Sequence, residues 1–304
     1  MAQIVLKKEF KDRYTTLTDL EKIIEYLNLP ERKSLRVNTI KTTIPYLKKR
    51  LSDNLEFKEI SWCKEGFFVK RKQKFALGSL LEHSLGYFYI QEASSMIPAM
   101  VLSPKKTDLV LDFAAAPGSK TTQMAALMQN KGLIVANDIK YERLKALSIN
   151  LTRMGVANTV ITLMHGLAFK TNKFDKILLD APCSGTGTLR KSPQTLQIYN
   201  TSMITKLARI QQILLLGAFD NLRQGGMLVY STCSLEPEEN EGVIDFLLSQ
   251  RKDASLERIS IEVNSSKPIL DFEGKTYNQE IKKCLRVWPQ DNNTDGFFVA
   301  KIKK

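Results

Sequence analysis

Between residues 108 and 231 the sequence alternates short apolar segments with longer amphipathic ones, and few folds accommodate that order. The short segments are rich in Val, Ile and Leu, as buried strands are, and the longer ones repeat apolar residues at helical spacing. Strands that alternate with helices predict a mostly parallel, doubly wound sheet with right-handed crossovers. The expected strands are 108–112, 133–136, 159–163, 176–180 and 227–231, and the expected helices are 119–128, 141–154, 204–222 and 239–248.

The segments on either side of this region complete the predicted α/β architecture. Two late apolar runs, 285–288 and 296–302, have a connection too short for a helix, and they predict an antiparallel hairpin at the sheet edge. We expect a small α/β domain over residues 1–85 and a larger domain over 86–304. The small domain is expected to have helices over 1–28 and 42–51 and strands over 34–40, 62–69 and 75–77.

The net charge of the chain indicates which kind of molecule it binds. The net charge is +13, and residues 1–86 hold 18 Lys and Arg against 11 Asp and Glu, so this third is the more basic per residue. A strongly basic domain favours a polyanionic partner, nucleic acid first, although a generic solvated surface would give the same net charge. The basic cluster 70–74 lies beside Phe67, Phe68 and Phe75. This pattern suits phosphate contact with base stacking, and it suits a solvated hairpin tip equally well.

Several classes of protein are excluded. No run of 18 or more apolar residues is present, and the N-terminus lacks an apolar signal core, so we expect a cytoplasmic protein. The four cysteines form no C-x-x-C pair, and four in a chain this long do not make a disulfide scaffold. With two histidines besides, no metal site is expected.

The turn over residues 112–121, which follows the first strand of the sheet, is rich in small residues. Because small residues leave the backbone accessible, a ligand can approach it there, at the N-terminus of the next helix. The dinucleotide pattern G-x-G-x-x-G is absent. A P-loop is excluded too, because Phe113 stands in place of its first glycine and Ser119 interrupts its Gly-Lys pair. Asp138 ends the second strand, where an acid can accept two ribose hydroxyls, although it could also cap a helix. A ribose site without a pyrophosphate loop indicates S-adenosylmethionine.

Two cysteines follow strand ends and are candidate nucleophiles. Asp180 ends one strand and is followed by Cys183, while Cys233 follows the strand 227–231. Parallel strands end at one sheet edge, so both thiols can face one pocket, although a tight turn with an incidental cysteine would also explain the first. Cys63 and Cys284 lack such a context and are expected to be packing residues. The residues alone do not decide which of the two strand-end thiols attacks.

Taken together, these motifs resemble RNA cytosine-5 methyltransferases of the Fmu/Sun family, in the short archaeal-type tRNA form. The resemblance covers most of the chain. The segments that carry it are 35–38, 91–95, 112–121, 137–138, 180–185, 230–234, 238–240 and 295–298.

The resemblance implies a class I, Rossmann-like methyltransferase domain, an N-terminal RNA-binding module and S-adenosyl-L-methionine as cofactor. His165 stands about where the family usually has an acid near the adenine. The implied cofactor contacts are Ala114, Ala115, Ala116, Pro117, Gly118, Ser119, Lys120, Asp138, Arg143, His165 and Asp180.

The resemblance also implies the roles in catalysis. A thiolate adds to C6 of an unpaired or flipped cytosine and makes C5 nucleophilic. In the family the attacking thiol corresponds to Cys233, Cys183 assists product release, Asp180 meets the base edge, and Lys120 joins the same network. We expect tRNA as the substrate of a chain that acts alone or with a protein partner. Ribosomal RNA is the alternative substrate, and a non-catalytic RNA-binding assembly factor is the alternative of another class.

Overall fold

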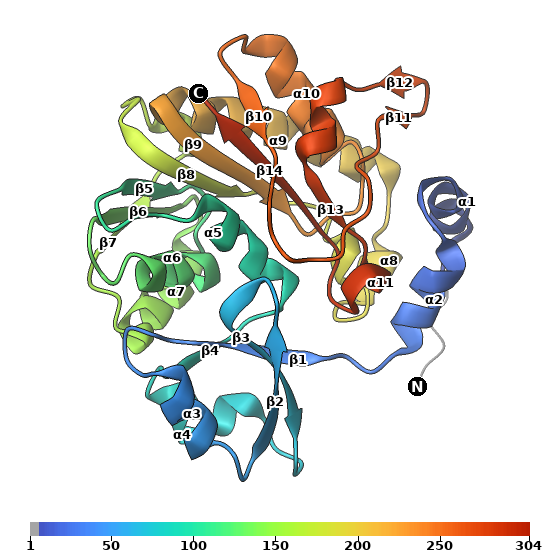
Figure 1. Cartoon of the computed structure of the whole chain (residues 1–304). Coiled ribbons are helices and arrows are strands. Elements are labelled where there is room, and N and C mark those ends of the chain that lie inside the picture. The colour runs from blue at the N-terminus through green and yellow to red at the C-terminus, as the bar shows by residue number, and fades with distance from the viewer. Residues whose placement is uncertain (1–5) are drawn as a thin grey trace.

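The computed structural model describes residues 6–304 and has a large sheet beside a small one (Figure 1). The strand order of the large sheet is β10-β14-β9-β8-β5-β6-β7, and β13 pairs with β14 off this path. The five strands β9, β8, β5, β6 and β7 are parallel, which confirms the predicted sheet. These strands are β5 (Leu109–Asp112), β6 (Leu133–Asp138), β7 (Thr159–Leu163), β8 (Phe174–Asp180) and β9 (Leu222–Thr232).

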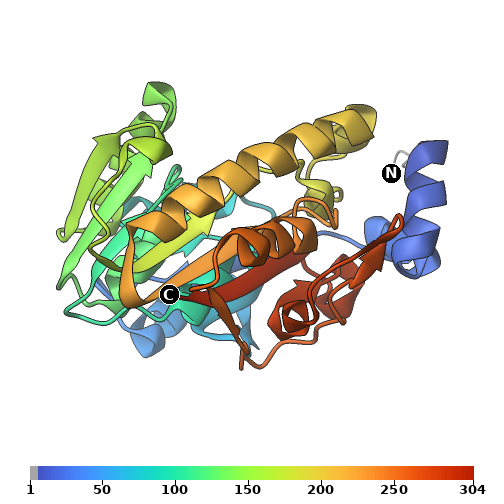
Figure 2. The same cartoon turned by 90° about the horizontal axis from the view of Figure 1, so that it is seen from above.

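Side chains along these strands point alternately into two cores, one on each face of the large sheet. Val110 and Leu178 pack against α5 (Ile97–Leu102) and α6 (Ser119–Leu127). Their neighbours Leu111, Ile177 and Leu179 pack on the other face, against α9 (Thr201–Asn221) and α10 (Glu241–Gln250). Figure 2 shows the long helix α9 lying along that face.

The helix α7 (Tyr141–Met154) covers β6 and begins and ends where the sequence predicts. Gly155 follows it in the left-handed conformation, with φ of 71°. A Cβ at this position would meet only the end of the flexible Lys41 side chain, so the left-handed backbone is the reason that glycine is favoured here.

The small sheet has the order β2-β3-β1-β4, with every pair antiparallel. The expected strand over 75–77 is wrong: this segment forms a loop that leads into the 3₁₀ turn η1 (Leu77–Ser79). The strand β3 is paired with β1 on one side and with β2 on the other, so neither edge of β3 is left for a strand at 75–77. The sequence did not indicate this pairing. The elements are β1 (Lys33–Val37), α3 (Ile44–Arg50), β2 (Leu55–Ile60), β3 (Cys63–Arg71), α4 (Leu81–Ser84) and β4 (Phe88–Ile90).

Two helices precede the small sheet, α1 (Lys8–Leu17) and α2 (Leu20–Asn28), and residues 1–5 of the expected helical segment lie outside the described residues. Asp19 separates the helices, because its side chain accepts a hydrogen bond from Lys22 N and caps α2. Both helices pack against the part of the chain that forms the large sheet rather than on the small sheet, as Figure 1 shows. The division into domains at residue 85 stays a prediction.

The two late strands pair antiparallel as expected, β13 (Leu285–Val287) with β14 (Phe297–Lys303). They lie at the edge of the sheet as expected: β14 pairs with β9 on one side, and on its other side it pairs with β13 and with β10 (Ser255–Glu257). The three-residue strand β10 was not predicted, because so short a segment carries too little alternation to be recognised in a sequence. Across residues 6–304, no helix has the length and apolarity that crossing a membrane requires. Short elements connect the rest: η2 (Ser94–Met96), η3 (Gly166–Ala168), η4 (Thr186–Thr188), α8 (Gln194–Gln197), β11 (Asp271–Phe272), β12 (Lys275–Thr276), η5 (Gln279–Lys283) and α11 (Pro289–Asn292).

Candidate active site

The candidate site lies at the carboxyl ends of the parallel strands. From β5 the sheet continues through β6 and β7 in one direction and through β8 and β9 in the other. Ligands of open α/β sheets bind at such a reversal of strand order. Asp112, Asp138 and Asp180 end β5, β6 and β8, and Cys233 directly follows β9.

The two candidate thiols are in contact. The Sγ atoms of Cys183 and Cys233 are 3.3 Å apart, and both residues are half-buried. The expectation that the two strand-end thiols face one place is therefore confirmed, although they are fifty positions apart in the chain. Cys63 and Cys284 are buried, as expected of packing residues.

A buried ion pair lies beside the thiols. Lys120 Nζ donates to Asp180 Oδ2 at 2.6 Å and to Ser95 Oγ at 3.1 Å, and the lysine is only 8% exposed. Ser231 Oγ donates to the second carboxylate oxygen of Asp180 at 2.7 Å. Burial disfavours the Lys120 ammonium, but the charge and hydrogen bond of Asp180, aided by Cys233, raise the pKa of Lys120 above its ordinary value. Lys120 thus stays a cation within electrostatic reach of Cys233.

The two thiols differ in their surroundings. The hydrogen bond with Cys233, burial, and the nearby charges of Cys233 and Glu239 raise the pKa of the Cys183 thiol well above its ordinary value. Cys183 is therefore held as a thiol. Of the two cysteines, Cys233 is the one that contributes to the raised pKa of Lys120.

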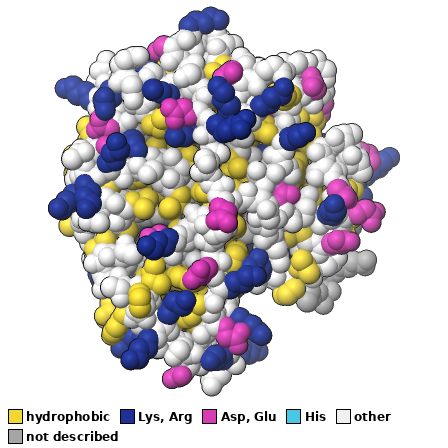
Figure 3. Space-filling view, in the orientation of Figure 1, with side chains coloured by type: hydrophobic (Ala, Val, Ile, Leu, Met, Phe, Trp, Pro, Cys, Tyr) yellow, Lys and Arg dark blue, Asp and Glu magenta, His cyan; other side chains and the backbone are white. Residues whose placement is uncertain are grey.

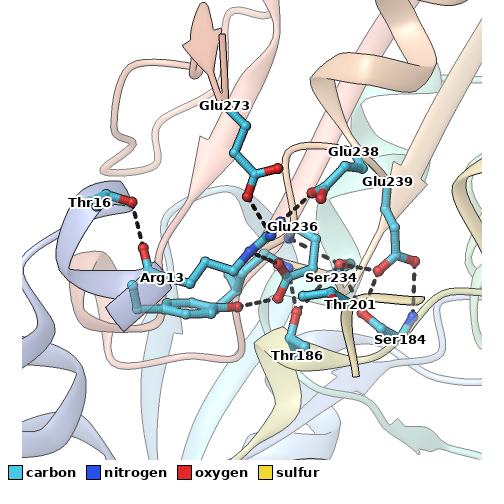
Figure 4. Close-up of polar contacts among 12 residues, drawn as sticks. Arg13, Thr16, Ser184, Thr186, Thr201, Ser234, Glu236, Glu238, Glu239 and Glu273 are labelled. Atoms are coloured by element: carbon cyan, nitrogen blue, oxygen red, sulfur yellow. Dashed lines mark hydrogen bonds and ion pairs between the residues drawn. The ribbon is translucent and has the colours of Figure 1, made fainter. Parts of the chain in front are cut away.

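Glu239 joins the two loops that carry the cysteines, a role that the sequence reasoning did not assign (Figure 4). Its fully buried carboxylate accepts Ser184 N at 3.0 Å, Ser234 Oγ at 2.7 Å and Gln211 Nε2 at 2.7 Å, and it also accepts Ser184 Oγ. Burial raises the pKa of Glu239, and these hydrogen bonds oppose the rise. Glu239 lies in the 238–240 motif of the sequence, but that motif does not indicate which residues its carboxylate binds.

Backbone contacts fix the position of Cys233. Gly187 N donates to Cys233 O at 2.9 Å, and Gly296 N donates to Gly187 O at 2.9 Å. A Cβ on Gly187 would lie 2.6 Å from Gly296 O and 2.7 Å from Cys233 O. Three segments distant in sequence therefore meet at this glycine with no room for a side chain.

The turn after β5 is held by two of the expected cofactor residues. Asp138 is 1% exposed, and its carboxylate accepts Ala116 N at 3.3 Å and pairs with Arg143 Nη1 at 3.1 Å. Arg143 Nη2 donates to Ala116 O at 2.5 Å. The residue that caps α7 is Lys140, so Asp138 is not the N-cap. These contacts bring Asp138, Arg143 and the 114–118 turn together, with Gly118 leading into α6.

The loop after β7 is fastened to the same region by Asn137, whose role the sequence did not reveal. Its amide donates to Met164 O at 3.0 Å, and its Oδ1 accepts Met164 N at 3.0 Å. His165 follows and is exposed. A Cβ on Gly166 would lie 2.1 Å from the Phe113 ring, so this loop packs directly on the turn after β5.

Arg36 of the small sheet reaches the start of α6 and was likewise missed. Its Nη2 donates to Thr122 Oγ1 at 2.8 Å and to Ser119 O at 3.2 Å, and its Nε donates to Gln91 Oε1 at 2.8 Å. Burial lowers the pKa of Arg36 to about 10. The small sheet thereby supports the helix that carries Lys120.

Comparison with known proteins places this geometry in a family. Residues 99–303 match the family described as 16S rRNA methyltransferase RsmB/F, and residues 6–93 match the N-terminal domain of 16S rRNA methyltransferase RsmF. The chain belongs to the RsmB/F family of RNA methyltransferases. It is accordingly a methyltransferase, and the predicted resemblance and enzyme class are confirmed.

Two curated relatives of this RsmB/F-family chain differ in length. The tRNA (cytosine(49)-C(5))-methyltransferase of Pyrococcus abyssi is 45% identical over 302 residues, which cover 98% of this chain and 96% of that protein. The ribosomal RNA small subunit methyltransferase F of Shewanella piezotolerans is 43% identical over 94% of this chain, which spans only 60% of that protein's length.

Solved structures confirm the class I, Rossmann-like fold of the RsmB/F-family chain. A methyltransferase homolog protein from Pyrococcus horikoshii superposes with a TM-score of 0.86 at 39% identity, over 99% of this chain and 96% of that one. NSun6 from Pyrococcus horikoshii, solved with the S-adenosylmethionine analogue SFG, also gives a TM-score of 0.86, at 28% identity over 100% and 99% of the two chains.

Proposed function

We propose that this chain transfers a methyl group from S-adenosylmethionine to C5 of a cytosine in tRNA, through a covalent bond between Cys233 and C6. The observation that carries the proposal is the pair of thiols 3.3 Å apart beside the Lys120–Asp180 ion pair. One thiol alone would serve many reactions, but the second thiol and the buried acid together suit an attack followed by an elimination. The Pyrococcus abyssi relative, covered over almost its whole length, supports tRNA as the substrate.

The proposed reaction begins at C6, because C5 of cytosine is a poor nucleophile until the ring is activated. The Cys233 thiolate forms a bond to C6, and the electron pair of the C5–C6 double bond becomes available at C5. When bound, S-adenosylmethionine would supply a methyl group on a positively charged sulfur. C5 would form a bond to the methyl carbon, and the electron pair of the broken carbon–sulfur bond would stay on the sulfur of the departing S-adenosylhomocysteine. A base then removes the C5 proton, the C5–C6 double bond is restored, and Cys233 leaves as a thiolate.

Asp180 and Lys120 are proposed to act at the polar edge of the base. Negative charge develops in the ring when the thiolate adds, and a carboxyl group at the N3 and N4 edge stabilises the activated base. The Asp180 side chain is 30% exposed, whereas that of Lys120 is 9% exposed, so Asp180 is the member of the pair that a base can reach. Lys120 and Ser231 each hold one of its oxygens and thereby fix its orientation.

The residues around the 114–118 turn fit the cofactor that we propose. The turn consists of small residues, and a Cβ on Gly118 would meet the Leu147 side chain at 2.9 Å. Asp138 offers a carboxylate at the end of β6, the position from which an acid can accept ribose hydroxyls. The exposed His165, in the loop fastened by Asn137, is proposed to lie near the adenine. Arg143 pairs with the Asp138 carboxylate and holds it in place.

Cys183 is proposed to assist release of the product, since its raised pKa keeps it a proton-bearing thiol next to the Cys233 sulfur. In a Cys183→Ala variant we expect release to slow by about 100-fold, as when an acid–base group is removed. A protein–RNA adduct that survives denaturing electrophoresis should then accumulate when cofactor and RNA are present. A Cys183→Ala/Cys233→Ala variant is the control and should form none. Rapid turnover by Cys183→Ala without an adduct would argue against the release role.

The small sheet provides the surface that we propose for RNA. A groove of about 790 Å³ lies along β2 and β3 and continues to residues 30–33. Phe57 and Phe68 line it, and the Arg32 guanidinium lies 3.4 Å from the centre of the Phe68 ring. Figure 3 shows basic side chains around the lower lobe that this sheet forms. Aromatic rings among basic side chains suit single-stranded RNA. The basic residues of the groove are Arg32, Lys33, Lys58, Lys70, Arg71 and Lys74, and the acidic ones are Glu31 and Glu56.

Removing three of these charges tests the groove. In a Lys70→Ala/Arg71→Ala/Lys74→Ala variant we expect the slope of log affinity against log salt to fall by about 2, since each phosphate contact of single-stranded RNA contributes about 0.7. Methyl transfer at saturating RNA should be unchanged, because the groove contains none of the reacting groups. The matched control removes three exposed lysines elsewhere, Lys252, Lys275 and Lys282. Equal slopes for the two variants would rule out the groove as the phosphate contact.

The choice of substrate is tested by bisulfite sequencing of total RNA from cells with and without the gene. We expect one or more tRNA cytosines to lose their resistance to conversion when the gene is deleted. The Shewanella relative favours ribosomal RNA as the alternative. Loss of a ribosomal 5-methylcytosine with all tRNA sites intact would replace tRNA with that substrate, and no change in any RNA would favour a non-catalytic role.

A further inference from the structure

The loop that follows Cys233 is held by side chains from the first helix of the chain. Glu236, three residues after Cys233, is completely buried. Its two carboxylate oxygens bind Arg13 and Tyr14, adjacent residues on α1. More than 220 positions separate the partners, and neither belongs to the catalytic or cofactor residues assigned above.

Arg13 compensates a group of three acids. Its Nε donates to Glu236 Oε2 at 2.9 Å, its Nη2 donates to Glu238, and its Nη1 donates to Glu273 Oε1 at 3.1 Å (Figure 4). The guanidinium also lies 4.7 Å from the centre of the Phe272 ring. One cation therefore ties α1 both to the loop after Cys233 and to the β11–β12 hairpin, and its side chain is only 7% exposed.

Tyr14 adds a second, independent contact. Its hydroxyl donates to Glu236 Oε1 at 2.6 Å, and its ring is fully buried. Burial raises the pKa of Glu236 to about 7, and Arg13 and the Tyr14 hydroxyl limit that rise. Without these two partners a buried carboxylate would have to take a proton or move toward water.

The connection from Glu236 back to Cys233 has little freedom. Glu236 N donates to Ser234 Oγ at 3.1 Å, and that hydroxyl donates to Glu239 at 2.7 Å. Leu235 N donates to Thr186 Oγ1 at 2.9 Å, and the Leu235 side chain packs in the same core as Tyr14. A displacement of Glu236 is therefore transmitted to the residues next to the thiol.

We propose that Arg13 and Tyr14 are positioning residues that set the place of the Cys233 thiol through Glu236. The inference rests on the proposed role of Cys233 as the nucleophile. In this proposal α1 contributes to catalysis as well as to the fold. The sulfur must approach C6 closely and along one direction, and a small misplacement of a reacting atom slows a reaction far more than it weakens binding.

The test measures how fast Cys233 bonds to RNA. RNA that contains 5-fluorocytosine is a suitable probe, because a fluorine at C5 cannot be removed as a proton and the adduct persists. For Arg13→Gln we expect trapping and kcat to fall by about 10- to 100-fold, the effect of a misplaced group. The KM values for RNA and cofactor should stay within about 3-fold, since the binding surfaces are untouched. Arg13→Lys keeps the charge and should recover part of the loss.

The matched control is Arg251→Gln. Arg251 also pairs with acids, Asp220 and Asp253, and lies 4.8 Å from the centre of the Phe219 ring, but it belongs to no thiol loop. We expect its trapping rate to equal that of the wild type. Tyr14→Phe is the second test variant, because it removes one hydroxyl from a filled core and folds even if Arg13→Gln does not. Its trapping should fall by about 3- to 10-fold, which corresponds to one lost hydrogen bond.

The outcomes separate this inference from the function on which it rests. If the wild type forms no adduct on Cys233, the assignment of the nucleophile fails. If the wild type forms the adduct and Tyr14→Phe and folded Arg13→Gln form it at the same rate, Arg13 and Tyr14 have no positioning role. Slower trapping with an equally large rise in the KM for RNA would also overturn the proposal, because it would indicate lost binding.

Discussion

Replacing Cys233 with alanine is expected to reduce methyl transfer by about four orders of magnitude or more, as removal of an enzyme's nucleophile does. The proposed attack on C6 of cytosine needs a thiolate, and Cys233 is the thiol that lies within electrostatic reach of the Lys120 ammonium. We do not expect Cys183 to take its place, because burial and the nearby charge of Glu239 still raise the pKa of Cys183 when its hydrogen bond with Cys233 is lost. Single-turnover transfer of a labelled methyl group measures the loss, and trapping on 5-fluorocytosine RNA should disappear with it.

Cys284→Ala is the matched control for that experiment. Cys284 is buried in the core between α10 and the large sheet, away from the thiol pair. Its removal should cost about 1–2 kcal/mol of unfolding free energy, because a small cavity is left, and should leave methyl transfer unchanged. If Cys233→Ala retains substantial activity while Cys183→Ala loses all of it, the two thiols have the opposite roles.

The Asp180→Asn variant is expected to lower kcat by about 1000-fold, which is typical when a group that stabilises developing charge is removed. An amide cannot provide the carboxyl group at the base edge, and it leaves the Lys120 ammonium without its anion at 2.6 Å. Asp180 is partly exposed, so solvent moderates the loss, and we expect the free energy of unfolding to fall by about 1–3 kcal/mol. Methyl transfer at saturating RNA and urea unfolding measure the two effects separately.

Asp175→Asn, at the other end of the same strand, is the control. Asp175 also pairs with a cation, Arg223, and it accepts Leu109 N at 2.7 Å. Its replacement should lower stability by a comparable amount of about 1–3 kcal/mol and leave kcat unchanged. If Asp180→Asn behaves like Asp175→Asn, the Lys120–Asp180 pair is structural and takes no part in the chemistry.

The central part of the fold could be predicted from the sequence because its signals are local and repeated. The helix α7 and the strand β7 begin and end at the predicted residues, since periodic apolar positions and the turn at Gly155 mark them. Because parallel strands end at one edge of a sheet, the sequence also predicted that Cys183 and Cys233 lie close together, as they do. The three-residue strands β4 and β10 were missed, because so few residues carry no pattern and the pairing partner decides the structure. The strand β2 was also missed, although Leu55 and Phe57 alternate with polar residues there.

The supports of the site could not be predicted in this way. Arg13 is one of 45 basic residues, and nothing in its neighbourhood indicates a partner more than 220 positions later. Arg36 belongs to a motif of the family, yet only the structure shows that it holds α6 from the small sheet. Sequence patterns reveal residues that the chemistry requires at strand ends. They do not reveal which distant side chains hold those residues still, because tertiary packing alone determines that.

The position of β14 has a consequence for the synthesis of this protein. Its three sheet neighbours, β9, β10 and β13, come earlier in the chain, so β9 has an unpaired edge until residues 297–303 have been made. Unpaired edges of apolar strands invite pairing with other chains. Gly296, which directly precedes β14, also holds Gly187 against the backbone of Cys233. The nascent protein therefore completes the pairing of β9 and the backbone contact that holds Gly187 against Cys233 in one late folding event.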